Sequence, residues 1–231
     1  MQRITVACLD MAGTTVADDG SVLSAFRAAA AEFGLTPGAP GYAEAIAFVQ
    51  DTMGQSKIEV FRQLLGSEDR AQRGNQVFEE SYAESVRAGL VTALPGAAKT
   101  ITALRAEGIK VCLCTGFAPA TRDAVLDALG WRPLIDLALS PADAGRGRPW
   151  PDMPLTALLR LGGGAVSELA VVGDTAADVE SGLRAGAGLV AGVTSGSASR
   201  EALVAAGAPN ILDSVAGLLP LVRLGAADAV G

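Results

Sequence analysis

The feature that most constrains the fold is a rhythm of short, unbroken apolar runs, each followed by a longer stretch with helical periodicity. The apolar runs occupy residues 4–9, 110–114, 137–140, 169–172 and 188–193. Runs this continuous are typical of strands buried on both faces of a parallel sheet. Helical patterns alternate with them over residues 97–107, 120–129, 153–161 and 176–185, which indicates right-handed βαβ crossovers. The sequence therefore predicts an α/β fold with a doubly wound parallel sheet.

One segment of the chain, residues 18–90, interrupts this rhythm. It carries helical patterns over residues 21–33, 42–48, 56–65 and 70–88, but no convincing strand. Turn-forming sequences flank it, DDG up to Gly20 and LPG up to Gly96, and such turns suit the points where a chain leaves and rejoins a sheet. We expect a core domain of residues 1–17 and 91–231, with a helical domain of residues 18–90 inserted after the first strand.

Composition and charge exclude several classes of partner. The formal net charge of −7 argues against nucleic acid, because nonspecific binding to a phosphate backbone needs clustered Lys and Arg. Half of the residues are hydrophobic, yet no window reaches the roughly 20 consecutive apolar residues that span a membrane. The N-terminal sequence RITVACLD enters a strand pattern without a secretory signal. We infer a cytoplasmic protein that binds neither nucleic acid nor membrane, although a small anion could still bind locally.

The three cysteines have the pattern of small buried hydrophobes. Cys8, Cys112 and Cys114 each lie within an apolar run, where unpaired cysteines are commonly buried. Their odd number does not favour a disulfide framework. A zinc site would need a fourth ligand, and the chain contains no histidine and no fourth cysteine. We therefore expect all three to pack in the core.

Polar residues follow the predicted strands at the point where each strand ends. Asp10 follows the first strand, Thr115 and Gly116 follow the second, and Asp174 follows ELAVVG. Arg148 lies in a turn sequence, GRGRPWPDM, after another strand. In open parallel sheets, ligands bind outside the carboxyl ends of the strands near a topological switch point. We expect these side chains to share one crevice.

Together these residue types suit a phosphoryl-transfer site. Asp10, Asp174 and Asp178 offer the oxygen ligands that Mg²⁺ prefers. Thr115 and Arg148 would hold a phosphoryl group through hydroxyl and charge-assisted hydrogen bonds. Taken alone, an aspartate after a strand is more often a helix cap or a turn residue. The combination of three aspartates with Thr115 and Arg148 instead favours a phosphoryl-transfer site.

Four segments, in this order, resemble the motifs of the haloacid dehalogenase superfamily. They are DMAGTT from Asp10, CTGF from Cys114, GRGRP from Gly145 and GDTAADVESG from Gly173. The resemblance extends over residues 1–196 and implies a Rossmann-like α/β core with an inserted α-helical cap domain. It also implies covalent phosphoryl transfer, in which Asp10 attacks phosphorus and water later hydrolyses the aspartyl phosphate.

The same resemblance implies a magnesium site. By position, the ligands would be Asp10, the backbone carbonyl of Ala12, and Asp174. The ion would offset the repulsion between the attacking carboxylate and the phosphoryl oxygens. Asp178 would bind through water or orient the site from behind the ligands.

Ala12 stands where most members of the superfamily carry a second aspartate, which serves as general acid and base. Without that acid, an enzyme that expels an alkoxide forfeits roughly 10²- to 10⁴-fold in rate. The chain resembles the branch that does not need the acid, the phosphonoacetaldehyde hydrolases or phosphonatases. It shares DxAGT from Asp10, Arg148 at the basic position and Lys57 in the helical insertion. In that branch the lysine forms an iminium with the substrate aldehyde, and the iminium accepts electrons as the C–P bond breaks.

Lys57 has a second interpretation. It is the only lysine of the helical insertion and follows MGQS at the start of an amphipathic helix. The alternative is a solvated lysine in a first helical turn, where the helix dipole mildly disfavours a cation. A mostly apolar pocket would instead lower its pKa and make it nucleophilic. Alongside Ala12 and Arg148, we favour the Schiff-base role.

The resemblance implies further substrate or phosphate contacts and also shows departures. The implied contacts are Ala12, Gly13, Met53, Thr115, Gly116 and Arg148. Val60 occupies the position of a histidine that follows the branch's lysine by three residues, and Phe117 replaces a usual aromatic hydroxyl. Both changes remove polar groups that could move protons during imine chemistry. The branch further implies that two copies can pair as a homodimer through the cap.

These observations predict a Mg²⁺-dependent hydrolase that cleaves the C–P bond of phosphonoacetaldehyde or a related phosphonate. The alternative is a phosphatase for a substrate with a good leaving group, such as an acyl phosphate, with Lys57 as a charge clamp; a noncatalytic phosphate-sensing module is less favoured. We further expect Arg146 to be a surface charge and Trp131 and Trp150 to pack rather than line a pocket. The loop GVTSGS, residues 192–197, would offer backbone amides to an anion.

Overall fold

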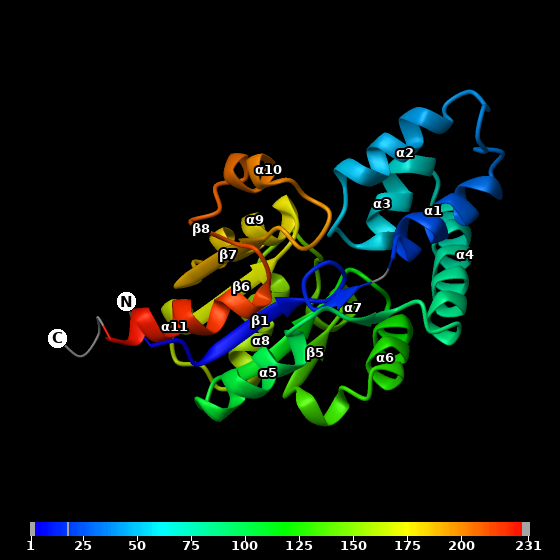
Figure 1. The fold of residues 1–231 in the computed structure, drawn as a ribbon. Helices are drawn as coiled ribbons and strands as arrows, with labels where there is room; N and C mark the ends of the chain where they lie inside the picture. Colours follow the sequence, from blue (N-terminus) through cyan, green and yellow to red (C-terminus); the bar gives the residue numbers. More distant parts are fainter. Residues whose placement is uncertain (1–2, 18, 228–231) are drawn as a thin grey trace.

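A six-stranded parallel sheet forms the centre of the molecule (Figure 1). The computed structural model describes residues 3–17 and 19–227, with side chains through residue 224. The strand order is β5-β4-β1-β6-β7-β8. The strands are β1 (Val6–Asp10), β4 (Lys110–Cys114), β5 (Leu137–Leu139), β6 (Leu169–Gly173), β7 (Leu189–Val193) and β8 (Asn210–Leu212). The chain winds first to one side of β1 and then to the other, so the topological switch point lies beside β1.

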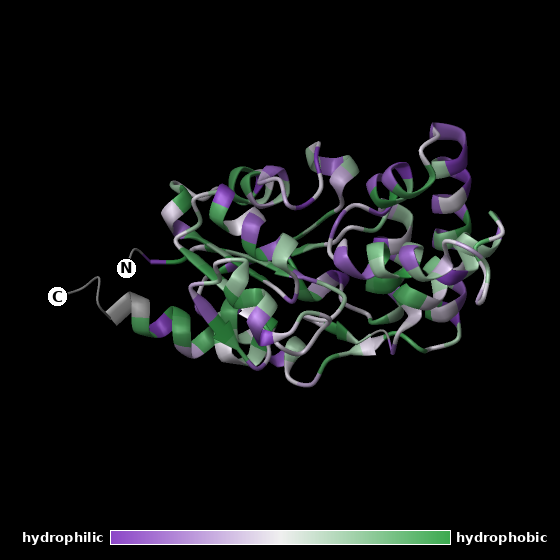
Figure 2. Cartoon of the chain, turned by 90° about the horizontal axis from the view of Figure 1, so that it is seen from above, coloured by the Kyte–Doolittle hydropathy of each residue, from purple (hydrophilic) through white to green (hydrophobic). Residues whose placement is uncertain are grey.

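Both faces of the sheet are covered, which is why the central strands are apolar on both sides. Along β1, Val6 and Cys8 pack on one face with Met153 of α8 (Asp152–Arg160). Ala7 and Leu9 pack on the opposite face, because strand side chains alternate with a period of two. The other helices beside the sheet are α5 (Ala97–Ala106), α6 (Pro119–Ala128), α7 (Pro141–Ala144), α9 (Ala176–Arg184), α10 (Arg200–Ala205) and α11 (Leu218–Ala227). Figure 2 shows hydrophobic residues along the central strands, whereas the helices mix both classes.

Residues 19–90, called here the helical insertion, lie beyond the carboxyl ends of the strands (Figure 1). Its described helices are α1 (Ser21–Ala31), α2 (Tyr42–Asp51), α3 (Lys57–Leu65) and α4 (Glu68–Arg87). The two connections to the sheet pair antiparallel as β2 (Val16–Ala17) and β3 (Thr92–Ala93). Phe26, Phe61 and Phe78 form an aromatic centre, with the Phe26 and Phe78 rings 4.6 Å apart. The Tyr82 ring lies 4.5 Å from that of Phe117 beyond β4, so aromatic packing also joins the insertion to the sheet.

The predicted parallel sheet is confirmed, and all five predicted strands are present with bounds within two residues of those expected. Strand β8 was not predicted, because it is a three-residue edge strand whose residues are only partly buried. The sequence pattern also failed to predict helices α10 and α11 and the short strands β2 and β3. The four helical segments expected in the insertion are helical.

Two expectations drawn from composition can be compared with the structure. Cys8, Cys112 and Cys114 are all unpaired and buried in the sheet, as predicted. Among the helices that the structure describes, none is both long and apolar enough to cross a membrane.

Candidate active site

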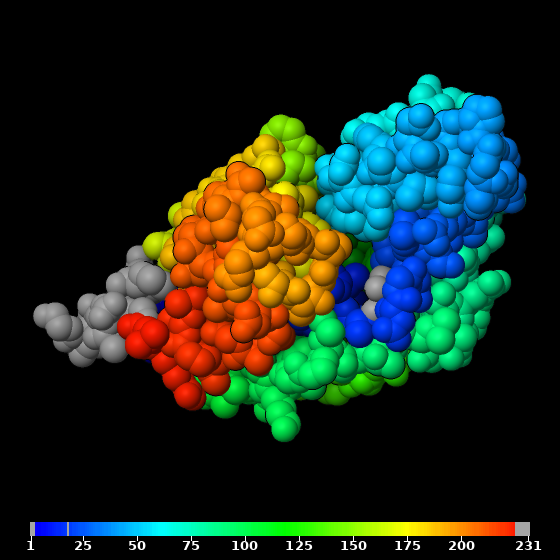
Figure 3. All heavy atoms as spheres, turned by 45° about the horizontal axis from the view of Figure 1, so that its top comes forward, coloured from blue at the N-terminus to red at the C-terminus, as the bar shows by residue number. Residues whose placement is uncertain are grey.

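A cleft of about 540 Å³ lies between the carboxyl ends of the strands and the helical insertion. Figure 3 shows the molecule hollowed between the blue part of the insertion and the orange segment after β7. Asp10 at the end of β1, Thr115 after β4 and Asp174 after β6 line the cleft from the sheet. Arg148 and Lys57 also line it. The structure therefore brings together five predicted residues from five distant parts of the sequence.

Three carboxylates form the acidic part of the site. Asp10, Asp174 and Asp178 each offer an oxygen within 4.8 Å of the others, and all three are buried. Burial raises the pKa of Asp10 well above its ordinary value, and the charges of Asp178 and Asp174 act in the same direction. Burial, followed by the charge of Asp178, raises the pKa of Asp174 to about 6. A cation at this place would stabilise all three ionised groups.

Arg148 supplies the buried positive charge of the cluster. Its Nη1 donates to Oδ1 of Asp10 at 2.6 Å and also to Oδ1 of Asp178. The guanidinium side chain is only 4% exposed, so the pairs are shielded from water and strongly coupled. Arg148 therefore fixes the orientation of Asp10 and links it to α9.

Asp178 has both carboxylate oxygens occupied by the protein. Oδ1 accepts from Arg148, and Oδ2 accepts from the backbone N–H of Thr175 at 3.2 Å and from its hydroxyl. The Asp178 N–H in turn donates to Oγ1 of Thr175 at 3.3 Å, so the two residues form a capping box at the start of α9. This arrangement suits a residue that orients Arg148 better than one that binds a cation directly.

Asp174 is held by the loop that follows β7. Its Oδ2 accepts from the backbone N–H of Ser197 at 2.7 Å and from the Ser197 hydroxyl at 3.0 Å. The amide expected to serve an anion therefore serves Asp174. The hydroxyl of Ser195 donates to the Gly13 carbonyl at 2.8 Å. Sequence reasoning named the loop 192–197 for its backbone amides but missed the serine hydroxyls and Thr175, because an isolated hydroxyl residue carries no periodic signal.

The loop after β1 brings the backbone close to Asp174. Gly13 has a φ of 86°, and a Cβ there would lie 2.5 Å from Oδ2 of Asp174. Glycine satisfies both the left-handed backbone and the close approach. Ala12 lines the cleft beside it and carries no polar side chain. Thr115 is buried, and its Oγ1 accepts from the Phe117 N–H at 3.3 Å.

Lys57 is a buried amine at the first position of α3. Its Nζ lies 5.6 Å from the Phe26 ring centroid and 5.5 Å from that of Phe117, and the residue is 6% exposed. Burial, and after it the charge of Arg148, lowers the pKa of Lys57 from 10.5 to about 8. At pH 7 about a tenth of such amines is neutral, against about one in 3,000 for an ordinary lysine.

The backbone of Lys57 is hydrogen-bonded to the sheet. The Lys57 N–H donates to the carbonyl of Gly116 at 3.1 Å, which satisfies one of the free N–H groups at the start of α3. Gly116 permits this contact, because a Cβ there would lie 2.3 Å from the Gln55 carbonyl oxygen. The helical insertion and the end of β4 are thus in direct backbone contact.

The two departures from the branch pattern have different surroundings. Val60 is fully buried in the apolar core and is not among the residues that line the cleft. Phe117 lines the cleft and covers Lys57 with its ring. Met53 lines the cleft as expected, and Gln50 does so without having been singled out.

The remaining aromatic and basic candidates lie outside the cleft. Trp131 is buried in the core, whereas Trp150 is 45% exposed. The Trp150 ring lies between the guanidinium groups of Arg146 and Arg184, at 4.3 and 5.1 Å. Arg146 is exposed and pairs with Asp152. The surface position of Arg146 and the core packing of Trp131 agree with the prediction. Trp150 does not line the cleft either, but it lies at the surface against two guanidinium groups and not in the core.

Comparison with known proteins identifies the family. The sequence pattern of the haloacid dehalogenase-like hydrolases matches residues 4–186. The chain is 30% identical over 217 residues to the phosphonoacetaldehyde hydrolase of Pseudomonas entomophila, covering 85% of this chain and 75% of that protein.

Solved structures agree with this match. A phosphonoacetaldehyde hydrolase-like protein from Oleispira antarctica superposes with a TM-score of 0.82 at 26% identity, covering 96% of this chain and 92% of the other. A putative phosphoglycolate phosphatase from Lactobacillus delbrueckii shares the fold, with a TM-score of 0.77 at 18% identity over 96% of this chain and 99% of that one. The protein is a hydrolase of the haloacid dehalogenase-like family, and the relatives it matches within that family include phosphonoacetaldehyde hydrolases.

Proposed function

We propose that the protein is a Mg²⁺-dependent phosphonatase that cleaves the C–P bond of phosphonoacetaldehyde or a closely related phosphonate. The observation that carries the proposal is Lys57, a buried amine with a pKa of about 8 in the same cleft as Asp10. A phosphatase has no need of a nucleophilic amine opposite its nucleophilic carboxylate. Imine chemistry needs one that is neutral near physiological pH.

The phosphoryl half of the site would use Asp10 as its nucleophile. Asp10 and Asp174, with the Ala12 carbonyl, would hold Mg²⁺, and the raised pKa values of both carboxyl groups support a cation at this place. When bound, the ion would neutralise charge between the carboxylate and the phosphoryl oxygens. Arg148 would keep Asp10 oriented through Oδ1, while Thr115 would donate to the phosphoryl group. Asp178, whose oxygens are occupied, would position Arg148.

The carbon half of the site would use Lys57. Its neutral amine adds to the substrate aldehyde and expels water to give an imine, which takes up a proton from solvent and becomes an iminium. When an oxygen of Asp10 attacks phosphorus, the C–P bond breaks and its electron pair moves into the iminium to form an enamine. Protonation and hydrolysis of the enamine return Lys57 and release acetaldehyde, and water hydrolyses the aspartyl phosphate.

Ala12 is consistent with this leaving group. An enamine leaves without a proton from the enzyme, whereas an alkoxide would need the acid that Ala12 cannot supply. The helical insertion would act as a cap domain of residues 18–90 that excludes water from the iminium. Its backbone contact at Gly116 supports this role, because the contact holds the insertion against the end of β4 beside Lys57.

The test is trapping of the imine. Wild type and Lys57→Arg are incubated with phosphonoacetaldehyde and borohydride and then analysed by peptide mass spectrometry. We expect a reduced two-carbon adduct on Lys57 in wild type and none in Lys57→Arg. Asp10→Asn should release no phosphate but still form the iminium. An unmodified Lys57 in folded protein with intact substrate would refute the imine route.

The second candidate is hydrolysis of a phosphate with a good leaving group, such as an acyl phosphate. Ala12, which cannot protonate a leaving group, favours such a substrate over an ordinary phosphomonoester. Val60 and Phe117 would leave imine chemistry at Lys57 without proton-transferring side chains. In that case borohydride traps nothing. Phosphate release from acetyl phosphate would then need Asp10 and persist in Lys57→Arg with a raised KM.

A further inference from the structure

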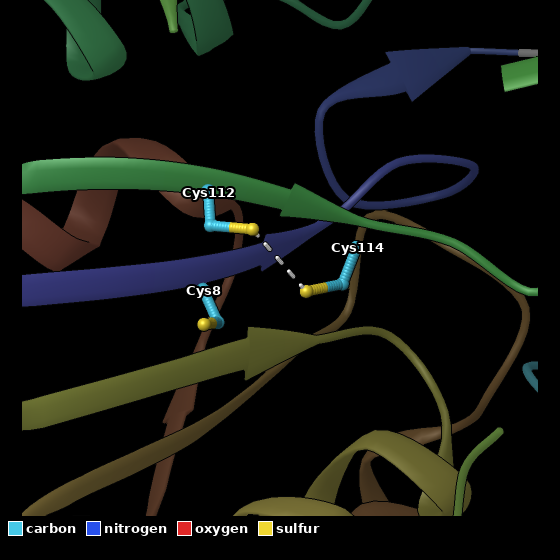
Figure 4. A group of neighbouring side chains, drawn as sticks. All are labelled: Cys8, Cys112 and Cys114. Carbon is cyan, nitrogen blue, oxygen red and sulfur yellow. Dashed lines mark hydrogen bonds between the residues drawn. The ribbon is translucent and has the colours of Figure 1, made fainter. Parts of the chain in front are cut away.

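The three cysteines form a compact sulfur cluster that the proposed reaction does not use. Cys8 on β1 lies opposite Cys112 on β4 in the parallel register, and Cys114 follows two residues later on the same face. The three Sγ atoms all lie within 4.8 Å of one another, and those of Cys112 and Cys114 are 3.8 Å apart (Figure 4). The spacing of Cys112 and Cys114 in the sequence already indicated that these two share a face of the strand. The position of Cys8 beside them follows only from the pairing of β1 with β4.

The spacing suits a single metal ion. For metal–thiolate bonds of about 2.3 Å, two sulfurs on one ion are about 3.8 Å apart in tetrahedral geometry and about 4.0 Å apart in trigonal geometry. The separation of 3.8 Å between Cys112 and Cys114 falls at this value. The residues are 2%, 0% and 6% exposed in chain order, so an ion here would be shielded from competing water.

The donor set selects a soft cation. A structural zinc site needs four N or S ligands, and the chain has three cysteines and no histidine. Among the described residues, Met153 of α8 adds a thioether to the same apolar cluster and lines a small void with Cys8 and Cys114. The void measures about 10 Å³, which is room for about one small atom. Asp10, Asp178 and Ser181 line the same void, but both carboxylates are paired with Arg148. Three thiols and a thioether are soft donors, and they favour Cu(I) over a harder cation.

Arg148 supplies the countercharge. It lines the same void, and its buried Nε has no hydrogen-bond acceptor among the described residues. A cationic N–H on the wall of the void can stabilise the negative charge of a metal–thiolate group. We propose that Cys8, Cys112 and Cys114 form a thiolate site for a soft monovalent cation, Cu(I), directly behind the catalytic carboxylate. Each thiol that becomes a ligand releases one proton, and no electron is transferred.

The position of the site predicts its effect on the hydrolase. Cys8 precedes Asp10 by two residues, and Cys114 lies opposite Asp10 in the register and directly precedes Thr115. Thiolate charge would compete for Arg148, which orients Asp10. Occupancy is therefore expected to inhibit phosphate release.

The test measures Cu(I) binding itself, so its outcome is independent of whether the enzyme cleaves a C–P bond. Cu(I) is added without oxygen to the folded protein, and to protein refolded in its presence, against a chromophoric Cu(I) chelator. We expect one equivalent per chain, with at least tenfold weaker binding by Cys112→Ser and Cys114→Ser. Asp10→Asn, which frees Arg148 from the competing carboxylate, is the matched control and should bind Cu(I) at least as tightly as wild type does.

X-ray absorption on loaded wild type makes the test independent of how the variants fold. Sulfur neighbours alone, at about 2.2–2.3 Å, support the site. Binding below a tenth of an equivalent, oxygen or nitrogen in the first shell, or equal affinity in a folded Cys112→Ser variant overturns it. Zn(II) under the same conditions should bind at least tenfold more weakly than Cu(I), and the reverse order would also contradict the proposal.

Discussion

Replacing Lys57 by methionine is predicted to stabilise the fold while abolishing imine formation. The lysine is 6% exposed, and its pKa is lowered from 10.5 to about 8, first by burial and then by Arg148. A lowered lysine pKa means that the folded state holds the charged amine less well than the unfolded chain does. Methionine has a similar length, carries no charge and packs well against the rings of Phe26 and Phe117.

The magnitude follows from the two pKa values. Between 10.5 and about 8, each pH unit corresponds to about 1.4 kcal/mol, so burial of the charged amine costs about 3 kcal/mol at pH 7. Attraction of the Lys57 ammonium to the rings of Phe26 and Phe117 offsets about 1 kcal/mol of this cost. We therefore expect Lys57→Met to raise the free energy of unfolding by about 2 kcal/mol at pH 7.

The pH dependence gives the sharper test. Between pH 8 and 10.5 the unfolded chain holds more protons than the folded one, so wild-type stability rises through this window. The gap between Lys57→Met and wild type should therefore narrow from pH 7 to pH 10 in urea denaturation. Lys99→Met, at an exposed lysine on α5, is the control and should change stability by less than about 0.5 kcal/mol at either pH. A less stable Lys57→Met at pH 7, or a gap that widens with pH, would refute the reasoning.

Three further predictions concern catalysis. If neutral Lys57 limits imine formation, kcat/KM should rise about fivefold from pH 7 to pH 8, as the neutral fraction goes from about a tenth to about half; a flat profile in the initial-rate assay would contradict this. Gly116→Ala should lower kcat/KM at least tenfold without loss of helical circular dichroism, because its Cβ would lie 2.3 Å from the Gln55 carbonyl oxygen. Ser197→Ala removes one of two hydrogen bonds on Oδ2 of Asp174 and should raise the Mg²⁺ concentration for half-maximal activity about tenfold; an unchanged Mg²⁺ titration would show that Ser197 does not position Asp174.

The sheet could be predicted because its strands are buried on both faces. The run at 110–114 has the observed bounds of β4, and the runs of β5, β6 and β7 each match to within one residue. The edge strand β8 lacks this signal, because one of its sides has no neighbouring strand and its residues Asn210, Ile211 and Leu212 stay partly exposed. Hydrophobic periodicity therefore predicts the central strands of the sheet but not the edge strand β8.

In the candidate site, the residues at strand ends could be predicted from the sequence, whereas the residues that orient them could not. Asp10, Thr115 and Asp174 were predictable, since parallel strands present their carboxyl ends at one edge. Ser197 orients Asp174, and Thr175 orients Asp178, through hydrogen bonds whose partners lie 23 and 3 positions away. A serine in a loop has no sequence pattern that predicts a distant hydrogen-bond partner. The contact between Ser197 and Asp174 could therefore be assigned only from the structure.

Backbone contacts at the end of β4 place the Lys57 amine in the same cleft as the Asp10 carboxylate. Asp10 pairs with Cys114 across β1 and β4, and two residues after Cys114 the Gly116 carbonyl accepts from the Lys57 N–H. The first turn of α3 is thereby tied to the same strand end that holds the nucleophile. Substitutions at exposed positions of α2, away from Gln50, should accordingly alter how readily the cleft opens, and hence KM. Only changes at the contact between Lys57 and Gly116 should separate the amine from the carboxylate and lower the rate of the bond-breaking step.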